Sequence, residues 1–306
     1  MSTIIETFLA GLAAAGAFIA VGALVERRFA AIRSATPTLG FNLLYYAPAS
    51  LIRALLGPAA AALTVLAVNG LGGGLVALPA RGWGLLLGLG AYLAAMDLGE
   101  YVFHRAQHQL PWLWAMHSLH HSDEAFNVST AIRHFWLEIF LKTFTIYLVV
   151  GVLFKADARI VALYAMLSSY NYFSHMNVRV GFGRLAWVLN SPQYHRRHHS
   201  SRPEDRDCNF AALLPVFDVL TGAYRAPEAG YYPETGLDEG ESPRGVLSAL
   251  IWPLRRQAPA ATANFQAASP SRGTRASMAR AWGLLAVPSR TRPTMPWQMP
   301  ARRKAL

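Results

Sequence analysis

Nine of the ten histidines in this chain have spacings that suit metal binding. His104 and His108 are four residues apart, and His175 stands alone. The other six form two triplets with the spacing HxxHH, namely His117, His120 and His121, and His195, His198 and His199. On a helix, residues three or four apart lie on one face, so each cluster directs two or three imidazoles at one place. The sequence therefore predicts a metal site.

The number of imidazoles indicates more than one ion. Imidazole nitrogen is a ligand that suits Fe, Zn and Cu, and nine such nitrogens exceed the coordination number of one ion, so we expect two metals. His134, the tenth histidine, stands outside these spacings and is interpreted as an ordinary polar residue. The single cysteine, Cys208, excludes disulfides and cysteine zinc sites. The sequence also lacks the HExxH helix of zinc proteases, a GxSxG serine motif and a glycine-rich phosphate loop.

Apolar stretches surround the histidines. The 306 residues are 53% apolar and 15% charged, whereas a soluble domain carries about 25% charged residues. Uncharged runs cover residues 7–25 and 54–80, and the first is close to the roughly 20 residues that cross a bilayer. In the second run we expect a helix that ends near Val68, and a third helix from about Trp83 into Tyr101.

Two shorter uncharged segments, residues 143–154 and 160–174, are predicted to form a helical hairpin that crosses the membrane and returns. Glu138 and Lys142 are four residues apart, and we expect them to pair and lengthen the first of these helices. The predicted fold class is therefore all-α: a polytopic membrane bundle of about four to five membrane helices, with a histidine-rich dimetal cap.

Basic residues predict the orientation. Arg27, Arg28 and Arg33 follow the first apolar run, and the positive-inside rule places them in the cytoplasm, which brings the histidines to the cytoplasmic side. The use of 25 Arg against 3 Lys indicates a bacterial origin and hence the bacterial inner membrane.

Four parts are expected along the chain. Residues 1–82 hold the first membrane helices, 83–228 the catalytic domain, 229–255 a membrane-surface segment, and 256–306 a disordered tail rich in Pro, Ala and Arg. The formal charge of +11 comes entirely from basic residues after Glu241, and residues 1–241 sum to zero. A nucleic-acid partner is therefore not expected.

The histidine-bearing stretches, over about residues 90–228, resemble the fatty acid hydroxylase/sterol desaturase superfamily of integral-membrane di-iron enzymes. DLGEYVFHRAQH (97–108), HSLHHSDE (117–124) and SPQYHRRHH (191–199) look like its three histidine boxes, and FSHMN (173–177) is similar to a motif between the second and third. DEAFNVSTAIR (123–133) is most similar to bacterial sterol-desaturase-like proteins and alkylglycerol monooxygenases.

The resemblance implies two Fe ions that use O2 and external electrons to hydroxylate a C–H bond of a lipid or another hydrophobic substrate. Desaturation by the same site is the alternative. The electrons would come from a separate protein of ferredoxin or cytochrome type. In many members a histidine occupies the position of Phe135, so His134 is out of register, and some lipid hydroxylases have a histidine where this chain has Asn171. Asn171 is therefore a possible additional ligand.

Polar residues near the boxes are candidates for orienting the ligands. Asp97 and Tyr101 share one helical stripe with His104 and His108, and we expect the Asp97 carboxylate to accept an imidazole N–H. The weaker candidates for the same task are Glu124, Arg133, Asn177, Asn209 and Asp218.

Two functions of other classes remain open. A metal or proton transporter could use histidine clusters as a relay, but its ionisable residues would lie near the bilayer midplane. A membrane zinc hydrolase would need a general base, and none is assigned.

Overall fold

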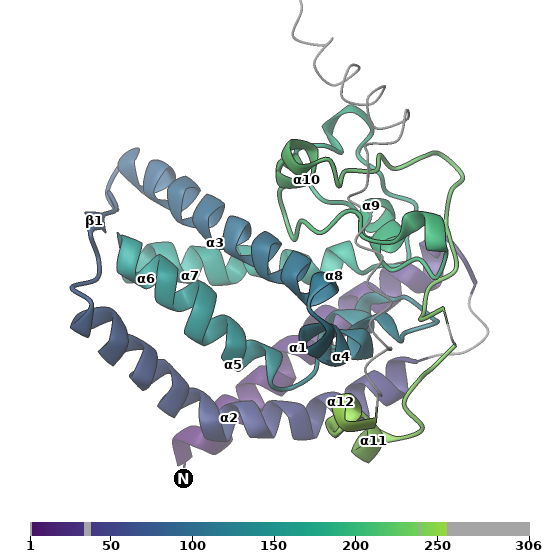
Figure 1. Cartoon of the computed structure of the whole chain (residues 1–306), viewed down its shortest axis with the longest axis horizontal. Helices are drawn as coiled ribbons and strands as arrows, with labels where there is room; N and C mark the ends of the chain where they lie inside the picture. Colours follow the sequence, from purple (N-terminus) through teal and green to yellow (C-terminus); the bar gives the residue numbers. More distant parts are fainter. Residues whose placement is uncertain (1, 34–37, 239, 256–306) are drawn as a thin grey trace, which may run out of the picture. The chain divides into compact units, whose positions relative to one another are not determined.

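The computed structural model describes residues 2–33, 38–238 and 240–255 of the chain. The predicted tail, 256–306, lies outside the described residues. Apart from one short two-stranded pairing, the regular structure of these residues is helical, which confirms the predicted fold class. Figure 1 shows the helices in chain order.

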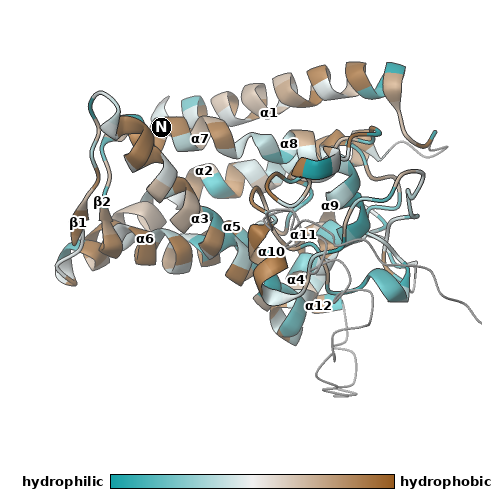
Figure 2. Ribbon diagram, turned by 90° about the horizontal axis from the view of Figure 1, so that it is seen from above, coloured by the Kyte–Doolittle hydropathy of each residue, from teal (hydrophilic) through white to brown (hydrophobic). Residues whose placement is uncertain are grey.

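Three helices are long and apolar enough to cross a membrane: α1 (Ser2–Phe29), α2 (Leu39–Gly70) and α3 (Gly84–Gln109). Only 17%, 17% and 28% of their most apolar windows are buried by protein, so most of this apolar surface is left for lipid. Figure 2 shows the long apolar runs of these helices. Three spans of this kind are described, against the four to five expected.

Helix α2 begins much earlier than the apolar run predicted. We expected its helix within residues 54–68, but the element starts at Leu39 and contains Pro48 and Pro58. The early part carries polar groups that form tertiary hydrogen bonds: Asn42 donates to Asp123 and Ser129, both at 2.9 Å. Those contacts stabilise a helical turn that polarity and proline alone argue against.

The predicted hairpin is present as two helical segments. The first consists of α5 (Glu138–Lys142), a π-helical turn η2 (Thr143–Tyr147) and α6 (Leu148–Leu153); the second consists of α7 (Ala158–Ser168) and α8 (Tyr170–Ser174). The strand β2 (Phe154–Lys155) joins them and pairs in parallel with β1 (Val76–Ala77), with Val76 opposite Phe154.

The remaining elements are short. They are α4 (Pro111–His121), η1 (Val128–Ile132), η3 (Gly183–Leu185), α9 (Pro192–His198), η4 (Pro203–Asp205), α10 (Val216–Thr221), α11 (Val246–Leu250) and α12 (Trp252–Arg255). The last two pack back on the fold, because Trp252 Nε1 donates to Ser118 Oγ of α4 at 2.9 Å. The buried core runs through α2, α3, α4 and the hairpin, around side chains such as Tyr45, Met96 and Leu119.

Candidate metal centre

The nine predicted ligand histidines lie in two groups. In each group, one nitrogen from every member lies within 4.8 Å of the others. The five-histidine group consists of His104, His108, His117, His121 and His198. The four-histidine group consists of His120, His175, His195 and His199. The structure therefore brings together every histidine that the spacing singled out, as two adjacent sets.

Each HxxHH triplet is divided between the two groups. Helix α4 sends His117 and His121, four apart, to the five-histidine group and His120 to the other. Helix α9 does the opposite, since His198 joins the five-histidine group while His195 and its C-cap residue His199 join the four-histidine group. Two short helices thus supply ligands to both centres.

Proline and a capping serine set the first residues of α4 and α9, the two helices that carry the triplets. Pro111 and Pro192 occupy the first turns of α4 and α9, where a missing N–H costs nothing and the fixed φ favours the helix. The Ser191 side chain caps α9 by accepting the Tyr194 N–H at 3.3 Å.

The five-histidine group presents unpartnered nitrogen atoms at its centre. The Nε2 atoms of all five members are buried without a hydrogen-bond partner in the described structure. Buried polar atoms are nearly always paired. Five unpaired Nε2 atoms in one group therefore indicate a site for a group that accepts their lone pairs. A metal ion would satisfy them together.

Backbone carbonyls fix which nitrogen carries the proton. His104 Nδ1 lies 2.7 Å from the Phe210 carbonyl oxygen, and His198 Nδ1 lies 2.8 Å from that of Cys208. A carbonyl only accepts, so Nδ1 must carry the hydrogen in both rings. Nε2 then holds a lone pair, which is the form that binds metal.

The same logic applies to the four-histidine group. His175 Nδ1 donates to the Asn171 carbonyl oxygen at 2.7 Å, which leaves a lone pair on its Nε2. That atom lies 3.2 Å from His120 Nε2 and 3.0 Å from His195 Nε2. Both nitrogens of His199 are buried without a partner in the described residues.

Burial keeps these imidazoles neutral. It lowers the pKa of His117 to about 4 and that of His175 to about 3. Burial, helped by repulsion between neighbouring imidazoles, also holds the pKa of His120, His121 and His199 well below the ordinary value. Neutral imidazole is the ligand that a metal needs.

The spacing of the nitrogens suits a transition-metal ion. Metal–imidazole bonds are about 2.0–2.1 Å, so ligands on opposite sides of an ion lie about 4.2 Å apart. The nitrogens of each group lie no more than 4.8 Å apart, so small shifts of the rings would bring them to that span. Both groups therefore fit one metal each.

Asp97 has a different task from the predicted one. Its two oxygens accept the Leu213 and Leu214 N–H groups at 2.9 and 2.8 Å, not an imidazole. Asp218 similarly accepts the Phe210 N–H at 2.9 Å, and also binds Ala211 N and Tyr194 Oη. The two carboxylates thus hold residues 208–214, whose carbonyls orient His104 and His198.

Glu138 lies against His117 and His134 and does not pair with Lys142, its predicted partner. Lys142 pairs with Glu100 at 2.6 Å, so the expected Glu138–Lys142 pair is wrong. Glu138 Oε2 instead accepts from Gln107 Nε2 at 2.7 Å and lies 3.3 Å from Nδ1 of His117 and of His134. A tertiary contact has replaced the local one.

His134 lies beside the centre without belonging to either group. It forms a separate cluster with His117 and Glu138, and its ring stacks on that of His120 with centroids 4.0 Å apart. Its sequence register excludes His134 from the ligands, and no sequence pattern indicates that its ring stacks on that of His120.

Three further candidates make no contact with an imidazole through their side chains. Tyr101 Oη contacts Thr221 and Arg105, and Asn177 accepts from Arg196 at 3.2 Å and donates to the Ile32 carbonyl at 2.7 Å. The Asn171 amide donates to the Ala131 carbonyl at 3.4 Å. Asn171 contributes to the site through its backbone carbonyl.

Sequence reasoning missed the buried Asp123 and understated Arg133. Asp123 accepts from Asn42 at 2.9 Å and from Thr130 at 2.7 Å, and lies 3.7 Å from Arg133. Arg133 in turn donates to the Leu119 carbonyl at 3.1 Å, where a cation favours the end of α4. The run of polar residues after the triplet His117, His120 and His121 is the available signal.

A cavity of about 370 Å³ opens beside the four-histidine group. Its wall combines His120, His175 and His195 with apolar side chains such as Leu93 and Ile139. Its size suits a small-molecule site, and its histidine wall makes it the candidate substrate cavity.

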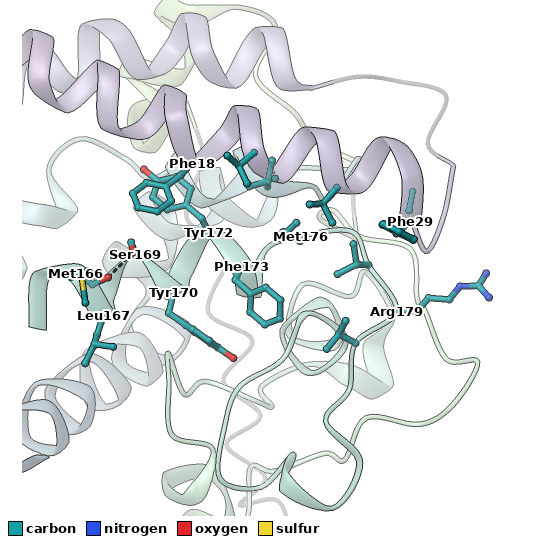
Figure 3. A pocket seen from close by; sticks show the side chains of 17 residues that line it. Phe18, Phe29, Met166, Leu167, Ser169, Tyr170, Tyr172, Phe173, Met176 and Arg179 are labelled. Atoms are coloured by element: carbon teal, nitrogen blue, oxygen red, sulfur yellow. Dashed lines mark hydrogen bonds between the residues drawn. The ribbon is translucent and has the colours of Figure 1, made fainter. Parts of the chain in front are cut away.

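A larger apolar groove of about 880 Å³ lies between α1 and the α7–α8 segment. Figure 3 shows Phe18 and Tyr172 toward one end, where their rings stack 5.0 Å apart, and Phe29 and Arg179 toward the other. Leu167 and Tyr170 line both this groove and the candidate substrate cavity. Apolar surface therefore continues from the outside of α1 to the wall of the site.

Comparison with known proteins agrees with this geometry. Residues 89–223 match the fatty acid hydroxylase family model, and this segment contains all nine ligand candidates. The matched segment is similar to a fatty acid hydroxylase domain. The superfamily resemblance seen in the sequence is thereby confirmed.

The relatives that this chain matches are named as enzymes of lipids. The chain is 35% identical over 134 residues to alkylglycerol monooxygenase of Danio rerio and 34% over 131 residues to that of Homo sapiens, covering 44% and 43% of this chain. It is 28% identical over 169 residues to ornithine lipid hydroxylase OlsE of Rhizobium tropici, covering 54% of this chain. The matches span 29% of each of the two monooxygenases and 50% of the hydroxylase. No solved structure matches.

Proposed function

We propose that this chain is an integral-membrane di-iron oxygenase that hydroxylates a C–H bond of a lipid. The observation that carries the proposal is the pair of histidine groups, each of which brings one nitrogen of every member within 4.8 Å of the others. The family match and the three apolar helices support a lipid hydroxylase in a membrane.

Iron is the proposed metal because the ligand set is all imidazole and the family relatives are oxygenases by name. Bound iron would supply the activation of O2 for C–H oxidation. The five-histidine group would hold one ion and the four-histidine group the other. Two electrons would come from a separate protein of ferredoxin or cytochrome type.

The chain's own residues hold and shield the centre. The carbonyls of Phe210, Cys208 and Asn171 keep three ligand rings in the metal-binding tautomer. Burial of the imidazoles limits access of water, which protects a reactive centre from side reactions. A lipid chain in the candidate substrate cavity would lie directly beside His120 and His175.

We place the centre on the cytoplasmic side of a bacterial inner membrane, where arginines at the end of α1 favour that orientation. Soluble reductases and ferredoxins would reach it there.

Isotope-labelled dioxygen tests the reaction. Membranes containing the protein would receive a reductant and electron donor, and extracted lipids would be examined by mass spectrometry. One labelled oxygen atom in a lipid, absent from the His120→Ala variant, is the expected result. A new double bond without label would favour desaturation, and no oxidised lipid in either sample would contradict the proposal.

A further inference from the structure

Arg53 occupies an unusual position on the wall of the candidate substrate cavity. It lies within α2 and directly precedes the uncharged run 54–80. It lines the same cavity as His120 and His175. Arg53 lies inside the candidate membrane span Leu39–Gly70. A charged side chain inside such a span is costly, and such residues face cavities or partners and mark binding sites or pathways.

The charge of Arg53 has no acidic partner in the described part of the chain. Its Nη2 donates to Tyr46 Oη at 2.6 Å, and its guanidinium carbon lies 5.3 Å from the centre of the Tyr46 ring. Lys142, on the same cavity wall, is instead neutralised by Glu100 at 2.6 Å. Tyr46 thus holds the Arg53 side chain in place, and the charge of Arg53 can still pair with an anion.

Ser50 provides an independent sign of a ligand. It lies one helical turn before Arg53, only 3% of its surface is exposed, and its hydroxyl has no hydrogen-bond partner in the described structure. Ser50 and Arg53 line a second cavity of about 140 Å³. Arg53, His134 and Ile139 line both this cavity and the candidate substrate cavity, so the two adjoin.

We propose that Arg53 and Ser50 bind an oxyanion of the lipid substrate, either a phosphate or a carboxylate. Guanidinium forms charge-assisted, two-pronged hydrogen bonds with both groups, and the Ser50 hydroxyl supplies a further donor. The headgroup would lie at the smaller cavity and the attached chain would extend toward the four-histidine group. This assignment rests on the proposed function and specifies its substrate as an acidic lipid.

Three probes with the same oleoyl chain test the assignment: lysophosphatidate, oleate and monoolein. Their headgroups are a phosphate, a carboxylate and a neutral glycerol. Binding to the metal-loaded protein in a neutral detergent would be measured by native mass spectrometry. We expect one or both acidic probes to bind at least about tenfold more tightly than monoolein, as a charged hydrogen bond predicts.

Arg53→Gln should abolish that preference and leave monoolein binding unchanged, and Ser50→Ala should weaken acidic probes about threefold. Arg53→Lys should retain part of the preference, which separates charge from folding. Arg184→Gln is the matched control, because Arg184 is exposed and lines neither cavity. Loss with only one probe identifies phosphate or carboxylate as the bound group, and loss with both assigns a general oxyanion site.

Equal binding of monoolein and the acidic probes would overturn the assignment, as would equal effects of Arg53→Gln and Arg184→Gln. Iron content and incorporation of labelled oxygen would be measured on the same preparations. A protein that binds acidic lipid through Arg53 without iron would contradict the proposed function alone. An iron-containing, active protein with no headgroup preference would contradict the oxyanion site alone.

Discussion

His121 and His199 stack face to face, with ring centroids 4.4 Å apart and an angle of 15° between the rings. His121 belongs to the five-histidine group and His199 to the four-histidine group. The two histidine groups are therefore in direct contact through these stacked rings.

The two groups should differ in their tolerance to loss of one ligand. His195→Ala leaves three imidazoles in its group, whereas His108→Ala leaves four in the other. We expect His195→Ala to lose about one metal per chain and His108→Ala to lose clearly less, because four nitrogens still complete a common coordination sphere. Plasma mass spectrometry measures both, with His134→Ala as a control that keeps its metal. Equal losses in the two ligand variants would argue against two separate centres.

Asp218→Asn should weaken metal binding without removing a ligand. Asp218 accepts two backbone N–H groups from the segment whose carbonyls orient His104 and His198. Groups that orient ligands typically contribute 10–100-fold to metal affinity, and we expect a decrease of that order in chelator competition. Asp157→Asn, at an exposed pair with Arg159, is the control. An unchanged affinity in Asp218→Asn would show that the loop keeps its position without the carboxylate.

Glu138→Leu should also lower metal affinity, by about tenfold or more, because His117 would lose the acceptor that orients its ring. Chelator competition again provides the measurement. Lys142→Met distinguishes the tertiary contact from a local helical pair, since Lys142 contacts Glu100 and not Glu138. The account predicts that Lys142→Met retains wild-type metal affinity. An equal loss of metal affinity in Glu138→Leu and Lys142→Met would support the predicted pair between Glu138 and Lys142.

Acid should destabilise the metal-free protein below about pH 6.5. Burial lowers the pKa of His117 to about 4 and of His175 to about 3, from 6.5. Between these values the unfolded chain binds more protons than the folded one, so the free energy of unfolding falls as the pH falls. Each imidazole contributes at most about 1.4 kcal/mol per pH unit. Thermal unfolding in detergent from pH 7.5 to 5 would show it, and a constant midpoint would refute buried neutral imidazoles.

The sequence predicted which histidines come together better than it predicted the groups that hold them in place. HxxHH spacing is a local property of a helix, so both triplets could be assigned from the chain alone. Their division between two groups depends on how α4 and α9 face each other. The carbonyls of Phe210 and Cys208 carry no side-chain signal, and only tertiary structure shows that they orient His104 and His198.

Local rules were wrong where a tertiary contact was stronger. Lys142 pairs with Glu100, which is 42 residues away in the chain, because packing of α3 against the hairpin brings the two together. Helix α2 begins at Leu39 because Asn42 finds buried partners. No sequence motif marks Arg53, because the role proposed for it depends on the cavities that it lines.

The iron content of the purified protein tests the central claim most directly. The protein would be extracted in detergent from iron-supplemented cells, and iron and zinc per chain would be counted by plasma mass spectrometry. The account predicts close to two irons per chain. One zinc, or no metal with both histidine groups intact, would contradict a di-iron centre.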